Sequence, residues 1–170
     1  MSPRPTGQLV ATAEGTDLVL TRNFTAEIDD VWASLTESDR TARWFASWTG
    51  EGKVGGTIRY RLTFEGEAPE AEMRIEACDP PMHLAVSAED EYGSWRLEAR
   101  LAESEGMTRL TFVHHLDEGA DVGSIGPGWE YYLDLLESSR DGLPSPDFDD
   151  YFPAQQAHYE GLVEQLRRPG

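Results

Sequence analysis

The sequence predicts an α+β fold, in which one curved antiparallel sheet of six to seven strands wraps around a long C-terminal helix, with two short helices after the first strand. Three observations predict it. The chain between residues 57 and 116 alternates apolar and polar side chains with a period of two, which is typical of strands with one buried face. Apolar residues recur at helical spacing from Trp129 to Leu136. A long sheet with one covered face must curl to bury that face.

Residues 1–15 lack the apolar core of a secretion signal, and we expect them to form a flexible tail on a cytoplasmic protein. Residues 16–26 are rich in β-branched and apolar side chains and predict the first strand. Thr25 suits a helix N-cap. The apolar stripe of the first short helix then consists of Ile28, Val31, Trp32 and Leu35.

The second short helix begins at Ser38 or Asp39 and ends in an aromatic cluster. That cluster comprises Trp44, Phe45 and Trp48. The glycine-rich residues 49–56, TGEGKVGG, do not form a phosphate-binding P-loop, because the lysine precedes the last two glycines and no GK[ST] is present. We expect a turn with a β-bulge at this point.

Five further strands follow, separated by the turn signals EGEAPE, CDPP, EDEYG and ESEG. The alternation directs one set of side chains inward and leaves mainly Arg and Glu on the outer face. The inward set is Ile58, Tyr60, Leu62, Phe64, Met73, Ile75, Trp95, Leu97, Ala99, Leu101, Leu110, Phe112 and His114. The strands therefore enclose an aromatic interior.

The long helix is expected to begin on the flexible GPG at residues 126–128, with Pro127 in its first turn, and to stop at Gly142. Its apolar stripe comprises Trp129, Tyr132, Leu133 and Leu136. The acidic residues between them are expected on the solvent side. These are Glu130, Asp134 and Glu137.

An acidic connector follows the long helix and leads into a terminal helix that begins near Pro153. The apolar side of that helix consists of Tyr159, Leu162, Val163 and Leu166. It packs either on its own sheet, which we favour, or on a second copy of the chain as a homodimer. The predicted organisation is therefore a flexible tail over residues 1–15, a domain over residues 16–142, and an extension of that domain over residues 143–170.

Composition narrows the classes of function. The 170 residues carry a net charge of −18 with only 14 Lys and Arg, so a basic surface for nucleic acid is not expected. No apolar run is long enough for membrane insertion. Cys78 is the single cysteine, which excludes an intramolecular disulfide, and we expect it to be a buried structural thiol.

At this point the chain resembles a known family, the SRPBCC superfamily with its START-like and birch-pollen-allergen-like helix-grip fold, and within it the heat-shock-protein ATPase activator-like branch. Five segments carry the resemblance, over residues 16–142. They are FTAEIDDVWASLTESDRTARWF, GKVGGTIRY, ACDPPMHL, GMTRLTFVHHL and GPGWEYYLDLL. The resemblance implies the helix-grip fold and a cavity between the sheet and the long helix.

The residues expected to line that cavity are mostly apolar and aromatic. They are Trp44, Phe45, Trp48, Tyr60, Leu62, Met73, Trp95, Leu97, Phe112, His114, Trp129, Tyr132, Leu133 and Leu136. Together they suit a flat, mostly apolar ligand that a few hydroxyl and indole donors contact. Each aromatic residue also has an alternative interpretation as ordinary core packing.

We expect neither a catalytic constellation nor a cofactor. His114 is the best candidate for a general base, because its parity points inward. His115 has the opposite parity, so the two histidines cannot hold one metal ion, and no metal-ligand spacing is present. The sequence therefore predicts binding of a small hydrophobic or aromatic molecule. The alternatives that the resemblance implies are an enzyme of the polyketide cyclase or dehydratase type and a co-chaperone-like interaction module.

Overall fold

The computed structural model describes residues 3–66, 69–91 and 93–167, which form one long sheet and four α-helices. The strands are β1 Gln8–Thr12, β2 Gly15–Phe24, β3 Ala46–Gly50, β4 Thr57–Leu62, β5 Ala71–Asp79, β6 His83–Asp90, β7 Gly93–Ser104 and β8 Met107–Leu116. The helices are α1 Ile28–Thr36, α2 Ser38–Thr41, α3 Val122–Asp141 and α4 Gln156–Arg167, and a 3₁₀ turn spans Phe148–Asp150.

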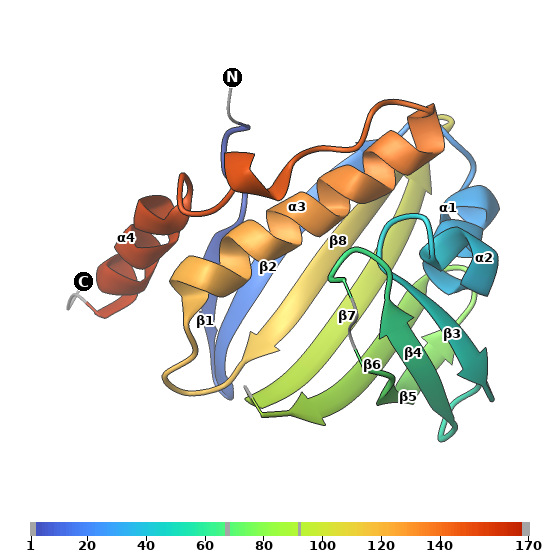
Figure 1. The fold of residues 1–170 in the computed structure, drawn as a ribbon, viewed down its shortest axis with the longest axis horizontal. Coiled ribbons are helices and arrows are strands. Elements are labelled where there is room, and N and C mark those ends of the chain that lie inside the picture. Colours follow the sequence, from blue (N-terminus) through green and yellow to red (C-terminus); the bar gives the residue numbers. More distant parts are fainter. Residues whose placement is uncertain (1–2, 67–68, 92, 168–170) are drawn as a thin grey trace.

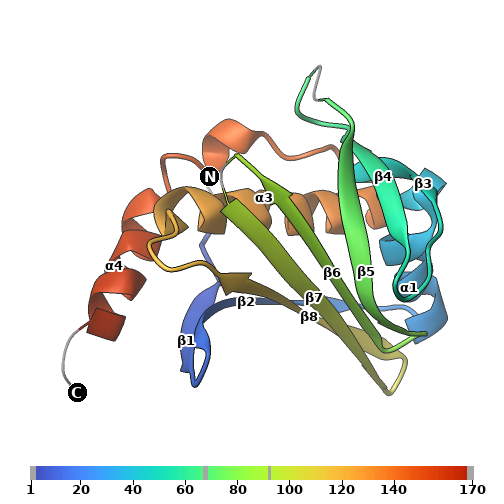
Figure 2. The same ribbon diagram turned by 90° about the horizontal axis from the view of Figure 1, so that it is seen from below.

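The sheet is antiparallel throughout, in the order β1-β2-β8-β7-β6-β5-β4-β3. It curves around α3, which crosses its concave face, while α1 and α2 lie at one end of that helix and α4 at the other (Figures 1 and 2). The predicted α+β class and helix-grip arrangement are confirmed. The described residues contain eight strands, where the sequence predicted six to seven.

The two additional strands are both at the edges of the sheet. β1 pairs with β2, so the prediction of a flexible tail is wrong for residues 8–12. β3 pairs with β4 and includes Trp48, which the sequence had assigned to the end of a helix. In fact α2 ends at Thr41. Both edge strands are five residues long and mostly exposed, so they lack the clear alternation that marks the central strands.

The start of α3 also differs from the prediction. The helix begins at Val122, so the GPG of residues 126–128 lies inside it. Gly126 is needed for close packing, because a Cβ atom there would lie 2.5 Å from the ring of Tyr159 on α4. The predicted stop is confirmed, since Gly142 caps the helix in the left-handed conformation with φ of 66°.

A buried polar network joins both ends of the chain to α3. Glu130 is 1% exposed, not on the solvent side as predicted, and pairs with Arg22 of β2 at 3.0 Å. It also accepts hydrogen bonds from the Tyr159 hydroxyl at 2.5 Å and from the Thr6 hydroxyl at 2.7 Å. Burial disfavours ionisation of Glu130, but these hydrogen bonds outweigh it and lower its pKa. The carboxylate thereby fixes the N-terminal segment and α4 on the same helix.

The terminal helix uses its apolar side within the chain. Tyr159 is fully buried, and Leu162 and Val163 pack against the main core. Leu166, the last apolar residue of the predicted stripe, is 41% exposed. Among the described residues, no helix combines the length and hydrophobicity of a membrane span.

Candidate ligand-binding cavity

A cavity of about 360 Å³ lies between two separately packed parts of the core. The larger part gathers β2, β7, β8, α1 and α3. The smaller part gathers β4, β5 and β6 around Ile58, Met73 and Ile75. The cavity is within the size range of small-molecule sites, which is roughly 300–1,000 Å³.

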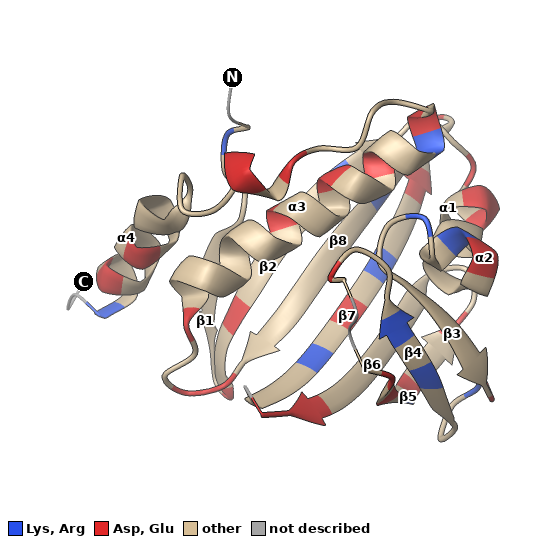
Figure 3. Cartoon of the chain, in the orientation of Figure 1, with Lys and Arg blue, Asp and Glu red and all other residues tan. Residues whose placement is uncertain are grey.

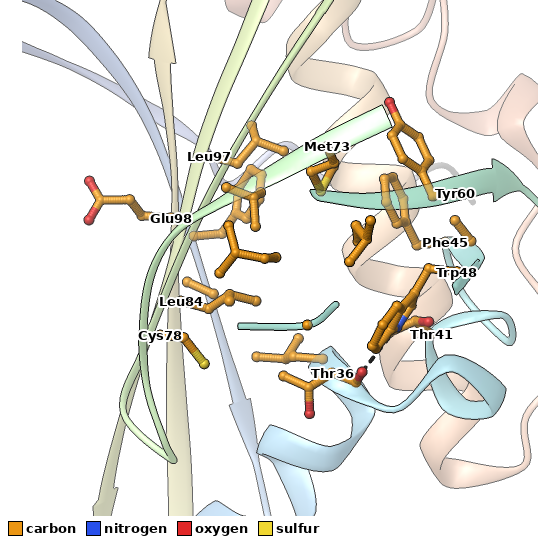
Figure 4. A pocket seen from close by; sticks show the side chains of 18 of the residues that line it. Thr36, Thr41, Phe45, Trp48, Tyr60, Met73, Cys78, Leu84, Leu97 and Glu98 are labelled. Carbon is orange, nitrogen blue, oxygen red and sulfur yellow. Dashed lines mark hydrogen bonds between the residues drawn. The ribbon is translucent and has the colours of Figure 1, made fainter. Parts of the chain in front are cut away.

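Its wall is made almost entirely of aliphatic and aromatic side chains. The lining residues are Trp32, Leu35, Thr36, Thr41, Trp44, Phe45, Ala46, Trp48, Gly52, Ile58, Tyr60, Met73, Ile75, Cys78, Pro80, Leu84, Val86, Leu97, Glu98, Ala99, Leu110, Phe112, Trp129 and Leu133. Figure 4 shows Phe45, Trp48, Tyr60 and Met73 on one side of the space and Leu84 and Leu97 on the other.

The pleat of the sheet explains why these side chains meet. Leu84 and Val86 of β6 pair with Ala99 and Leu97 of β7, so alternate residues of both strands point to the same face. Leu84 and Val86 are only half-buried although they lie on the inner face. They border the space that α3 does not fill.

The cavity reaches the surface between the loop after β3 and the turn after β5. Gly52 and Pro80 both line it and are both exposed. The Trp48 indole packs against this loop so closely that a Cβ atom on Gly52 would lie 2.9 Å from its ring. Cys78 also lines the cavity and is half-buried, where the sequence predicted a buried thiol.

The structure brings nine of the fourteen predicted residues to the cavity wall. These are Trp44, Phe45, Trp48, Tyr60, Met73, Leu97, Phe112, Trp129 and Leu133. The other five, Leu62, Trp95, His114, Tyr132 and Leu136, are not among the lining residues. Leu136 is fully buried in the main core, and Tyr132 donates a hydrogen bond to Glu65, three residues after the end of β4.

His114 is buried behind the cavity wall, with 2% of its surface exposed. Its Nδ1 accepts a hydrogen bond from the Trp129 indole at 3.1 Å, and its ring donates a hydrogen bond to the backbone carbonyl of Ser94. Burial lowers its pKa to about 4, against the opposing effect of Ser94, so the ring is neutral at pH 7. The hydrogen bond between His114 and Trp129 orients the indole ring of Trp129. His114 therefore supports the cavity wall, and Trp129 is the member of the pair that lines the cavity.

Three of the four tryptophans that line the cavity already donate their indole N–H within the protein. Trp44 Nε1 donates to Ser34 O at 2.8 Å, and Trp48 Nε1 donates to Thr36 O at 3.0 Å. The expectation that indoles would donate to a ligand is therefore wrong for these tryptophans and for Trp129. Their rings offer apolar surface alone.

Glu98 is the one charged residue among the described residues that line the cavity. Its carboxylate points away from the space, toward the outer face of β7 (Figure 4). There it contacts His83 at 2.7 Å and also His115, whose other ring nitrogen lies 2.7 Å from Asp17. This confirms the predicted outward parity of His115.

The sequence missed several lining residues on β6 and α1. Leu84 and Val86 belong to a segment whose alternation was recognised but whose inward residues were not selected. Trp32 and Leu35 were assigned to the apolar stripe of the first helix without being linked to the cavity. Two signals could have identified these residues. One is the inward parity of β6, and the other is the position of α1 at the open end of the sheet.

The comparisons with known proteins agree with this architecture. The family model of activator of Hsp90 ATPase homolog 1-like proteins matches residues 25–139. The crystal structure of CalU16 from Micromonospora echinospora has a TM-score of 0.73 and 26% identity, covering 94% of this chain and 97% of that one. No curated protein matches the chain.

Two further solved structures share the fold at lower identity. A conserved protein of unknown function from Enterococcus faecalis has a TM-score of 0.73 and 22% identity, covering 95% of this chain and 92% of that one. The Aha1 dimer from Colwellia psychrerythraea has a TM-score of 0.61 and 19% identity, covering 72% and 94%. Because the family model spans more than half of the chain, the protein belongs to the activator of Hsp90 ATPase homolog 1-like family of the SRPBCC superfamily.

Proposed function

We propose that the protein binds a small hydrophobic or aromatic molecule in the cavity between α3 and the sheet and does not transform it. The observation that carries the proposal is a cavity of about 360 Å³ with an almost entirely apolar wall that opens to the surface beside Gly52 and Pro80. Burying apolar ligand surface there would release about 25 cal/mol for each Å² removed from water.

An enzyme of the polyketide cyclase or dehydratase type is less well supported. Such an enzyme needs ionisable groups that converge on the substrate. His114, the best candidate, has its Nδ1 occupied by Trp129 and does not line the cavity. Glu98 turns its carboxylate to the outer face (Figure 4). The geometry favours binding over catalysis.

A protein-interaction role would use the surface, not the cavity. The family takes its name from activators of a chaperone ATPase, and the Colwellia relative is described as a dimer. A homodimer through residues 143–170 stays a prediction, although α4 already packs on α3 and β1 within the chain. Light scattering after size-exclusion chromatography, at concentrations from micromolar upward, distinguishes a monomer from a dimer.

The binding proposal is tested by filling the cavity. Ala99 lies on β7 and lines the space, so Ala99→Phe inserts a ring into it. Ala102 lies on the same strand with its side chain exposed on the outer face, which makes Ala102→Phe the matched control. The probe is N-phenyl-1-naphthylamine, an uncharged dye that fluoresces in apolar surroundings.

We expect saturable binding of the dye to the wild type and to Ala102→Phe. Ala99→Phe should weaken that binding at least about tenfold, because overpacking leaves the dye no room. Circular dichroism establishes that both variants are folded. Equal affinity of all three proteins for the dye would contradict binding in this cavity.

A further inference from the structure

We propose that the cavity accepts uncharged aromatic molecules and rejects carboxylates of the same shape. This inference rests on the proposed binding function and narrows it to a ligand class. Three features carry it: the lack of a cation in the described part of the wall, the internal use of three of its indole N–H groups and of its two threonine hydroxyls, and the negative charges near Tyr60.

The first feature is the charge of the wall. Among the described lining residues none is Lys, Arg or His, and the one ionisable carboxylate, Glu98, is negative and bonded to His115 and His83. Arg22, the one Lys or Arg that is buried in the described part of the chain, does not line the cavity. Its guanidinium pairs with Glu130 at 3.0 Å and Asp134 at 3.1 Å. A carboxylate moved into the cavity would therefore lose its hydration without gaining an ion pair.

The second feature is that several hydrogen-bond donors of the cavity wall already bond to acceptors within the protein. The indoles of Trp44, Trp48 and Trp129 donate to Ser34, Thr36 and His114 within the protein. The hydroxyls of the two lining threonines are used in the same way. Thr36 Oγ1 donates to Trp32 O at 2.8 Å, and Thr41 Oγ1 donates to Ser38 O at 3.2 Å. An anion could recruit these donors only by breaking hydrogen bonds that the fold already makes.

The third feature is the negative electrostatic potential near Tyr60. Tyr60 lines the cavity, and burial chiefly raises the pKa of its hydroxyl, while the negative charges of Asp90 and Glu65 raise it further. The same charges disfavour a ligand carboxylate beside Tyr60. Acidic residues also spread along α3 and α4 (Figure 3), and the whole chain carries a net charge of −18. Uncharged molecules are not affected by this field.

The test compares three naphthalenes of nearly the same shape at about pH 7: methyl 2-naphthoate, 2-naphthamide and 2-naphthoate. The amide separates the effect of charge from that of polarity. Each compound competes with N-phenyl-1-naphthylamine for the wild-type protein. We expect the ester and the amide to displace the dye, and the carboxylate to bind at least about tenfold more weakly than either, because charge burial is uncompensated.

The outcomes separate the inference from the proposed function. A carboxylate that competes as well as the ester would overturn the charge selection and leave the binding function in place. If neither the dye nor any of the three compounds binds, the proposed function fails and the inference fails with it.

Introducing a cation into the cavity wall tests whether the discrimination against carboxylates arises in the cavity. Met73 is 8% exposed and points into the space (Figure 4), and Lys has a similar unbranched chain. Met73→Lys should therefore raise the affinity for 2-naphthoate relative to the ester at least about tenfold, with Met73→Leu as the uncharged control. An unchanged preference in a folded Met73→Lys protein would contradict the assignment of the selection to this wall.

Discussion

The pair formed by Trp129 and His114 shows how a single side chain shapes the cavity wall. The indole N–H of Trp129 donates to His114 Nδ1, so it is not left unpaired in the apolar interior. Because burial lowers the pKa of His114 to about 4, that nitrogen keeps its lone pair at pH 7. The ring of Trp129 is then held against Phe112, with ring centroids 4.5 Å apart.

Two glycines of α3 provide a matched test of the helix packing. Gly126 faces the ring of Tyr159, whereas a Cβ atom on Gly128 would meet nothing within 4 Å. Gly128→Ala should stabilise the protein by about 0.5–1 kcal/mol, because alanine has the higher helix propensity. Gly126→Ala should instead destabilise it by about 1–3 kcal/mol, because the added methyl group overpacks the contact between α3 and α4.

The measurement is the free energy of unfolding in urea for the wild type and the two variants. Opposite signs for the two substitutions are the expected result. If Gly126→Ala were as stabilising as Gly128→Ala, α4 would not be packed against α3 as described.

At the scale of elements, the outer face of the sheet carries a chain of ionisable side chains across four neighbouring strands. Asp17 of β2 contacts His115 of β8, which contacts Glu98 of β7, which contacts His83 of β6. Burial opposes the charge on His115, but its hydrogen bonds to Glu98 and Asp17 outweigh that effect and raise its pKa. The charged imidazolium therefore stabilises the pairing of these strands.

The raised pKa of His115 predicts a pH dependence of stability. The stabilisation is fully present below the unfolded-state pKa of about 6.5 and is lost as the pH rises through the higher folded-state pKa. His115→Gln should thus destabilise the protein more at about pH 6 than at about pH 9. Urea unfolding of both proteins at the two pH values measures the difference. A loss that is the same at both values would mean that charge on His115 does not support the sheet.

Elements with strong local patterns could be predicted from the sequence, and elements that depend on distant contacts could not. The alternation in β4, β5, β7 and β8 indicated both the strands and their inner faces. β1 and β3 were missed because each is a short edge strand. The burial of Glu130 was also missed, because its partners Arg22, Thr6 and Tyr159 are far away in the sequence.

At the scale of the whole molecule, the cavity exists because α3 and α1 pack against only part of the long sheet. Eight strands form the sheet in the described residues, and α3 packs with α1 against the part built from β2, β7 and β8. The part built from β4, β5 and β6 forms a separate apolar cluster. The space between the two clusters remains, and it is lined by members of both.

The residues of the candidate site could be predicted where the alternation along a strand determines which face of the sheet a side chain points to. Inward parity identified Tyr60, Met73, Leu97 and Phe112, all of which line the cavity. Parity does not distinguish an inward residue that borders a space from one that is packed on all sides. His114 was selected by strand parity and Leu136 by helical spacing, and both are packed into the core, at 2% and 0% exposure.

The most direct test of the binding claim is the ¹H–¹⁵N NMR spectrum of the protein during titration with methyl 2-naphthoate. We predict that the indole N–H signals of Trp44, Trp48 and Trp129 shift together with one saturation curve, because these rings line the cavity. Amide signals of the outer face and of α4 should stay in place. Indole signals that do not move, or shifts confined to the outer surface, would contradict ligand binding between the sheet and α3.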